Sequence, residues 1–135
     1  MRWLVGVETV EGHLSFTPAA GRGPDDVRPA FDQQPIEAGV LAEACARAFT
    51  VTSDEAWLDA LRLCVGWFEG SNDIGARMFD PETGGSFDGL ESAGVNENQG
   101  AESTIAFVAT MQHAASLEAM SATTPQQAAR SAASS

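Results

Sequence analysis

Apolar residues recur with helical spacing in three segments of the chain and predict three helices. The first, residues 35–49, is apolar or small around most of its circumference, and the third, residues 100–117, has little polar surface in its first half. The second runs from a cap at Ser53 or Asp54 to about residue 68 and carries one apolar stripe and one charged side. We therefore expect the first and third helices to be enclosed by neighbouring protein and the second to be half exposed.

The N-terminal part of the chain is predicted to contain only short regular elements. Residues 3–7 and 13–16 favour two extended pieces joined by a turn at Glu11-Gly12, which predicts a short β-hairpin. Prolines and glycines are scattered through residues 17–32, and this composition is typical of an irregular loop.

A long segment rich in glycine and short polar residues, 69–98, separates the second and third predicted helices. It predicts a long loop with a hairpin over residues 78–87, and loops of this length in compact domains are often functional. The predicted organisation is an extended and loop segment, a helical-hairpin domain and a disordered tail, over residues 1–33, 34–120 and 121–135.

The order of the elements predicts the fold class. An enclosed helix, an amphipathic helix, a long loop and a second enclosed helix are typical of helical hairpins arranged in a ring, with inner helices surrounded by outer ones. We therefore predict a mainly α fold that forms part of an α/α toroid. In such a ring the two inner helices share one orientation, so their starts lie at the same mouth.

Two similar helix starts are the first candidate site. Gln34 and Glu37 begin the first helix, and Gln99 and Glu102 begin the third, 65 residues later. Amides and carboxylates at one mouth can bind sugar hydroxyls, and Glu37 and Glu102 could act as general acid and base if one were desolvated. The alternative is that both glutamates only cap the helices and complement their dipoles, which stabilises each by about 0.3–1 kcal/mol. Both interpretations stay open.

The long loop and the approach to the third helix supply further candidate ligand-binding residues. Phe87 could stack on a sugar ring, Asp88 could accept hydrogen bonds from hydroxyls, and Asn98 directly precedes the Gln99 motif. The alternative is a plain hairpin in which Phe87 is a packing anchor. The acidic residues of the loop lack EF-hand spacing, so we predict no calcium site.

The charge of the chain narrows the classes of partner. Nineteen acidic residues and seven arginines give 135 residues a net charge of -12, which repels phosphate backbones and anionic membranes. We expect neither nucleic acid nor a membrane as partner. No apolar run approaches the roughly 18–20 residues of a membrane span, and the N-terminus lacks the pattern of a signal peptide, so we predict a cytoplasmic protein.

Cysteine and histidine placement predicts no disulfide and no cofactor or metal. Cys45 and Cys64 lie inside predicted helices, and a hairpin turning near residues 51–52 would place Cys45 opposite residue 58, well away from Cys64. Two buried thiols fit a reducing compartment. His13 and His113 have no cysteine or second histidine at zinc-ligand spacing.

Four blocks of sequence resemble a known family. They comprise residues 32–38, 66–75, 80–90 and 96–104. In this order they resemble the C-terminal α/α-toroid region, of the six-hairpin glycosidase-like superfamily, in large bacterial proteins classed as glycosyltransferases. The resemblance covers about residues 10–115. It implies a role in carbohydrate metabolism, with a sugar or glycan ligand at the two helix starts and the Gly84-Gly85 loop.

The chain also departs from that family. A closed toroid needs several hairpins, whereas this chain supplies fewer than two, and no glycosyltransferase domain accompanies them. Our first hypothesis is a carbohydrate-active toroid fragment that binds or processes a glycan. The others are a noncatalytic helical accessory or interaction module, and a truncated remnant without independent activity. A missing domain or self-association would cover the apolar faces of the first and third helices.

Overall fold

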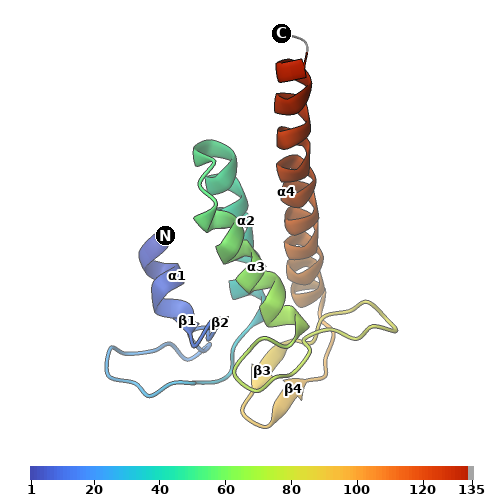
Figure 1. Cartoon of the computed structure of the whole chain (residues 1–135). Coiled ribbons are helices and arrows are strands. Elements are labelled where there is room, and N and C mark those ends of the chain that lie inside the picture. Colours follow the sequence, from blue (N-terminus) through green and yellow to red (C-terminus); the bar gives the residue numbers. More distant parts are fainter. Residues whose placement is uncertain (134–135) are drawn as a thin grey trace.

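The computed structural model describes residues 1–133, with side chains through Ser121. In this part the chain is mainly helical, with two small antiparallel β-hairpins (Figure 1). The elements in chain order are α1 (Arg2–Glu8), β1 (Thr9–Val10), β2 (His13–Leu14), α2 (Pro35–Thr52), α3 (Ala56–Glu69), β3 (Gly89–Glu91), β4 (Gly94–Asn96) and α4 (Ala101–Ala133).

The three helices predicted from apolar spacing are α2, α3 and α4. Pro35 occupies the first position of α2, where its missing N–H costs no hydrogen bond. Ser53 ends α2 in a left-handed conformation, with φ 54°, and its N–H donates to the Phe49 carbonyl at 2.8 Å. At the start of α3 the Asp54 carboxylate accepts a hydrogen bond from the Ala56 N–H at 3.0 Å, as expected of a capping side chain.

Helices α2 and α4 run in the same direction, and α3 runs antiparallel to both (Figure 1). A Cβ on Gly39 of α2 would lie 2.9 Å from the Ala106 Cβ of α4, closer than real Cβ contacts come. The missing side chain therefore lets the two helices approach closely at this point. Because this contact is within two turns of both helix starts, the starts lie at the same end of the molecule, as predicted.

The prediction that α2 and α4 are enclosed all round is wrong for one side of each helix. Val40 of α2 is 60% exposed, and Ile105 and Val108 of α4 are 67% and 42% exposed. Helix α3 covers a different side of α2, where Ala38, Leu41 and other residues are buried. A toroid would need additional helical hairpins to cover the exposed sides, and residues 1–133 contain none beyond α2–α3.

The prediction of a strand over residues 3–7 is also wrong, because these residues form α1. The hairpin itself exists, with its turn at Glu11-Gly12, but it pairs only Thr9 with Leu14 and Val10 with His13. Continuation of this register would place Ala19 opposite Leu4, but the Ala19 N–H donates to the Asp32 carbonyl at 2.8 Å instead. The residues before Thr9 therefore satisfy their backbone groups within a helix.

Residues 69–98, predicted as a long loop, contain the β3–β4 hairpin, which the sequence did not indicate. Within the region predicted as a hairpin, 78–87, the structure has only a single bridge between Phe79 and Ser86. Residues 17–32 form no helix or strand, as predicted. A second bridge joins Gln33, just before α2, to Leu90 of β3.

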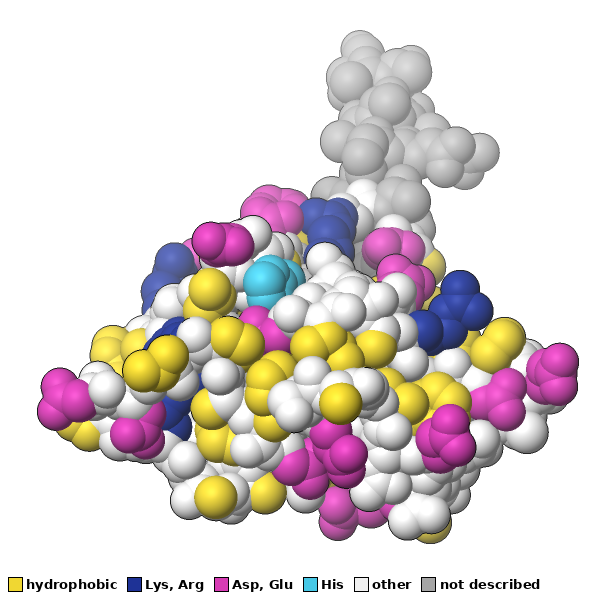
Figure 2. All heavy atoms as spheres, turned by 90° about the horizontal axis from the view of Figure 1, so that it is seen from below, with side chains coloured by type: hydrophobic (Ala, Val, Ile, Leu, Met, Phe, Trp, Pro, Cys, Tyr) yellow, Lys and Arg dark blue, Asp and Glu magenta, His cyan; other side chains and the backbone are white. Residues whose placement is uncertain are grey.

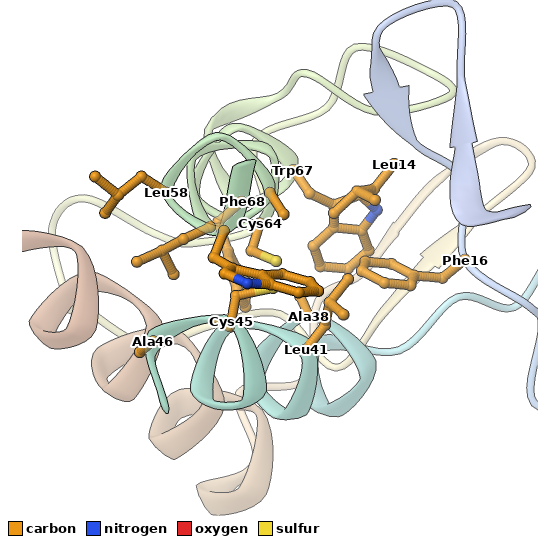
Figure 3. Close-up of a cluster of buried hydrophobic side chains, with 14 of the residues drawn as sticks. Leu14, Phe16, Ala38, Leu41, Cys45, Ala46, Leu58, Cys64, Trp67 and Phe68 are labelled. Atoms are coloured by element: carbon orange, nitrogen blue, oxygen red, sulfur yellow. The ribbon is translucent and has the colours of Figure 1, made fainter. Parts of the chain in front are cut away.

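The core lies where α2, α3 and β2 meet (Figure 3). Trp67 and Phe68 of α3 are fully buried, and Trp67 packs edge-on against both Phe16 and Phe68, with ring centroids 5.4 and 5.2 Å apart. Trp57 of α3 is buried as well, with 8% exposure.

Cys45 and Cys64 are free and buried, as predicted, but the expected separation between them is wrong. Both point into the contact between α2 and α3 (Figure 3). Burial raises the pKa of the Cys64 thiol, and the neighbouring Cys45 raises it further. The reason is that α2 continues to Thr52 and the link to α3 spans residues 53–55, which moves the centre of the hairpin and brings the cysteines opposite each other.

The C-terminal helix extends beyond the predicted end near residue 117, and its backbone is helical to Ala133. The predicted disordered tail, 121–135, falls almost entirely on residues whose side chains lie outside the described part, so it stays a prediction. Within the described residues, no helix combines the length and apolar character that a membrane crossing requires.

Candidate functional site

The candidate site is the end of the molecule at which α2 and α4 begin. The Gln33 N–H donates to the Leu90 carbonyl at 3.0 Å, and the Leu90 N–H donates back to the Gln33 carbonyl at 2.8 Å. These two bonds hold β3 beside the start of α2, while β4 leads directly into α4. Figure 2 views this end from below and shows acidic side chains spread across it, with hydrophobic side chains between them.

Three glycines give polar side chains room at this end. A Cβ on Gly89 would overlap the Asp32 carboxylate, and one on Gly85 would overlap the Gln99 amide. A Cβ on Gly100 would lie 2.7 Å from Asp88 Oδ1. Each glycine therefore lies against a specific amide or carboxylate, and a larger residue would displace it.

Gln99 and Asp88 brace the glycine-rich loop against the start of α4. The Gln99 Oε1 accepts a hydrogen bond from Thr83 Oγ1 at 2.7 Å, and its Nε2 donates to Asp80 Oδ2 at 3.3 Å. Asp88 Oδ1 accepts from the Gly100 N–H at 2.8 Å, which caps α4. The Glu82 N–H, and to a lesser extent Gln99, lower the pKa of Asp80, so this brace includes an ionised carboxylate.

No capping hydrogen bond is present in the described structure from the side chains of Gln34, Glu37 and Glu102. The Gln34 side chain forms no cap hydrogen bond, although its backbone carbonyl accepts the Glu37 N–H at 3.1 Å. Both glutamates are exposed at the first turn of their helices. The helix caps of α4 and α3 come instead from the aspartates Asp88 and Asp54. The described structure therefore shows no hydrogen-bonded capping by these side chains, whereas Glu37 and Glu102 both occupy first-turn positions that complement the helix dipoles.

Phe87 and Asn98 occupy different surroundings. Phe87 is partly buried and packs against the core, and its N–H donates to the Met78 carbonyl at 2.9 Å. Asn98 is exposed, and its N–H donates to Asn96 Oδ1 at 3.2 Å. A packing role for Phe87 fits this position, while its stacking on a sugar stays a prediction. The other aromatic of the loop, Phe79, stacks on Phe107 with ring centroids 4.6 Å apart.

A buried polar network next to this end was not anticipated from the sequence. Gln33 is fully buried, and its Oε1 accepts hydrogen bonds from the Phe16 N–H at 3.1 Å and from Trp67 Nε1 at 3.3 Å. Its Nε2 donates to Asp73 Oδ2 at 2.6 Å and to the Ala30 carbonyl at 3.0 Å. No spacing or composition signal marks a single glutamine as buried.

The same network reaches the N-terminal hairpin. Asp73 has a side chain that is 5% exposed, and its Oδ1 lies 2.9 Å from His13 Nε2. Asp73 is one of the acidic residues of the long loop, and its carboxylate contacts His13 and Gln33. Among the described residues no group of three or more potential ligands could hold a metal ion.

The chemistry available at this end is hydrogen bonding rather than charge neutralisation of anions. Exposed carboxylates accept from hydroxyl groups, and an amide both donates and accepts. The carboxylates of Glu37 and Glu102 meet these requirements at adjacent helix starts, with Gln34 beside them. A phosphorylated or otherwise anionic ligand would meet repulsion here.

No family model matches the chain, and no curated protein matches it with significance.

Proposed function

We propose that this chain is the glycan-binding part of an α/α toroid, whose ligand contacts the starts of α2 and α4. In this proposal Gln34, Glu37, Glu102 and Asn98 bind sugar hydroxyls. Gln99 and Asp88 hold the glycine-rich loop in place, and the outer oxygen of Asp88 can also accept from the ligand. The proposal extends the family resemblance to the geometry of this end.

One observation carries the proposal. The polar side chains at two parallel helix starts lie at the same end, and three of them, Gln34, Glu37 and Glu102, are not used for capping in the described structure. Glutamine is a poor capping residue compared with aspartate or serine, so a capping function would not explain its occurrence at two equivalent helix starts. Ligand binding would explain why these polar residues occur at both helix starts.

Binding is better supported than catalysis for the chain by itself. A carboxyl that acts as a general acid at neutral pH has to be withdrawn from water. Glu37 and Glu102 are both exposed, and no described residue covers them. We therefore propose acid and base roles for them only in a toroid that further hairpins, or a glycosyltransferase domain, complete.

A thermal melt of the full chain with a panel of neutral mono- and oligosaccharides tests the proposal. A ligand that binds only the native state raises the melting temperature in proportion to ln(1 + [L]/Kd). We expect one class of sugar to do so at concentrations well below those at which sugars stabilise proteins generally by exclusion. The double variant Glu37→Gln and Glu102→Gln should lose this shift while melting normally without sugar.

The matched control is Glu118→Gln, which makes the same change at an exposed position of α4 away from the helix start. It should keep the sugar-dependent shift. The proposal fails if no sugar class raises the melting temperature of the parent chain, or if the control loses the shift equally. A lower melting temperature of the double variant without sugar would instead support helix capping.

A further inference from the structure

We propose that Asp32 is a further ligand-binding residue of the sugar site, and that its carboxylate accepts a hydrogen bond from a hydroxyl of the bound glycan. This inference rests on the proposed function and adds a contact from outside the two helix starts. Asp32 is half-buried and lies two residues before Gln34, in the segment that leads into α2.

The backbone around Asp32 is held on both sides. The Asp32 carbonyl accepts a hydrogen bond from the Ala19 N–H at 2.8 Å. The next residue, Gln33, exchanges two backbone hydrogen bonds with Leu90 of β3, at 3.0 and 2.8 Å. These three bonds place the Asp32 side chain beside β3, at the end of the molecule where α2 begins.

The space for the Asp32 carboxylate comes from Gly89 of β3. The three atoms nearest to a Cβ on Gly89 would all belong to this carboxylate, so a larger residue would displace it. Glycine weakens a strand, and it often marks a place where another group approaches the backbone closely. Asp88, the residue before Gly89, caps α4 through the Gly100 N–H. The Asp32 carboxylate therefore lies between the segments that lead into α2 and α4.

Asp32 differs from the other two side chains that glycines accommodate at this end. Gln99 braces the glycine-rich loop and Asp88 caps α4, so both make hydrogen bonds within the fold. Asp32 Oδ1 is buried and has no hydrogen-bond partner among the described residues. None of the ion pairs formed by the side chains of residues 1–121 includes Asp32. The fold thus gives this oxygen a position but no donor.

A donor from the ligand would satisfy this carboxylate. A buried acceptor without a partner is costly to the native state, so its occurrence beside a proposed binding site favours a partner that arrives with the ligand. A carboxylate only accepts hydrogen bonds, and the hydroxyl groups of a neutral sugar are donors of the matching kind. The torsion about the Cβ–Cγ bond of aspartate is soft, so Asp32 can turn either oxygen toward a ligand at the surface.

Thermal melts of the full chain with glucose, galactose, mannose, maltose and cellobiose test this inference. Asp32→Asn keeps the size of the side chain and removes its charge. We expect the variant to bind the sugar that stabilises the parent chain at least about tenfold more weakly, because hydrogen bonds to a charged acceptor are the stronger ones. Without sugar, its melting temperature should be unchanged or higher, because the charge that it loses has no partner in the fold.

Gly89→Ala tests the same contact without altering Asp32 itself. Its Cβ would displace the carboxylate, so the sugar-dependent shift should shrink in this variant as well. The matched control is Asp25→Asn, which makes the same change at an exposed position of the preceding segment. The control should keep the shift, and an equal loss in the control would overturn the inference by showing a general effect of charge.

The results separate this inference from the proposed function. If no sugar raises the melting temperature of the parent chain, the proposed function fails and the role of Asp32 fails with it. If one sugar stabilises the parent chain and Asp32→Asn equally, only the role of Asp32 is overturned. A clear fall in the melting temperature of Asp32→Asn without sugar would also overturn it, because the carboxylate would then serve the fold.

Discussion

Replacement of Gln33 by methionine should be the most destabilising conservative change in this molecule. The two side chains have similar volume, so Gln33→Met tests hydrogen bonding rather than packing. It removes four hydrogen bonds of 2.6–3.3 Å and leaves the Phe16 N–H and Trp67 Nε1–H without an acceptor. Asp73, nearly buried, keeps only His13.

The expected loss follows from the groups left without partners. A buried donor or acceptor deprived of its partner costs about 1–3 kcal/mol. The bond to Trp67 is long and weak, and the individual losses are not additive, so we expect a total of about 3–5 kcal/mol. Native domains have only about 5–15 kcal/mol of stability, so this change removes a large part of it.

Urea unfolding monitored by tryptophan fluorescence measures this loss. With a slope of about 1.5–2 kcal/mol/M, the midpoint should move down by about 2 M while the slope stays the same. The control, Gln112→Met, makes the same change at an exposed position of α4 and should shift the free energy of unfolding by less than about 0.5 kcal/mol. A loss below about 1 kcal/mol for Gln33→Met would refute the reasoning, because the network would then not depend on the glutamine.

Two further predictions concern a close contact and the buried thiols. Gly89→Ala should lower the free energy of unfolding by about 1–3 kcal/mol, because its Cβ would displace Asp32. Gly6→Ala, in α1 with open space around it, should raise the free energy of unfolding by up to about 1 kcal/mol. Urea unfolding of both variants measures this difference, and equal effects of the two changes would contradict the prediction. Burial raises the pKa of Cys45 from 9.0 to about 11 and that of Cys64 as well, so the unfolded chain loses these protons first and stability should fall by about 1–2 kcal/mol for each thiol between about pH 8.5 and 10.5. The same pH series on Cys45→Ala should show a smaller fall in the free energy of unfolding. If Cys45→Ala loses as much stability over this pH range as the parent chain, the thiols are not the cause of the fall.

The sequence predicts the helices well because their apolar residues recur over many turns. Helices α2, α3 and α4 begin within a few residues of their predicted starts, and the parallel direction of α2 and α4 follows from the order of elements. The short elements are different, because a stretch such as Trp3–Val7 fits a strand or a helix equally well. The hairpin pairs only two residues on each side of its turn, and the Ala19 N–H that a longer ladder would use donates to Asp32 instead.

The candidate site was predictable only in part. The motifs at Gln34 and Gln99 mark both helix starts, but the sequence does not distinguish their roles. The Gln99 amide is occupied by Thr83 and Asp80, whereas the Gln34 side chain caps nothing in the described structure. The Gln33 network was missed because its partners come from three separate segments, and no periodicity connects them.

The contact between Gly39 and Ala106 affects how the protein folds during its synthesis. Helices α2 and α3 are neighbours in sequence and can associate as soon as the ribosome has synthesised both. The partner of Gly39 lies 67 residues further on, by the numbers of the two residues. Helix α3 ends at Glu69, 37 residues before Ala106, so at synthesis rates of about 5–20 residues per second the helical hairpin waits roughly 2–7 s for this contact. During that interval the side of α2 that later packs on α4 is open to other nascent chains, and we expect it to be the surface that chaperones recognise.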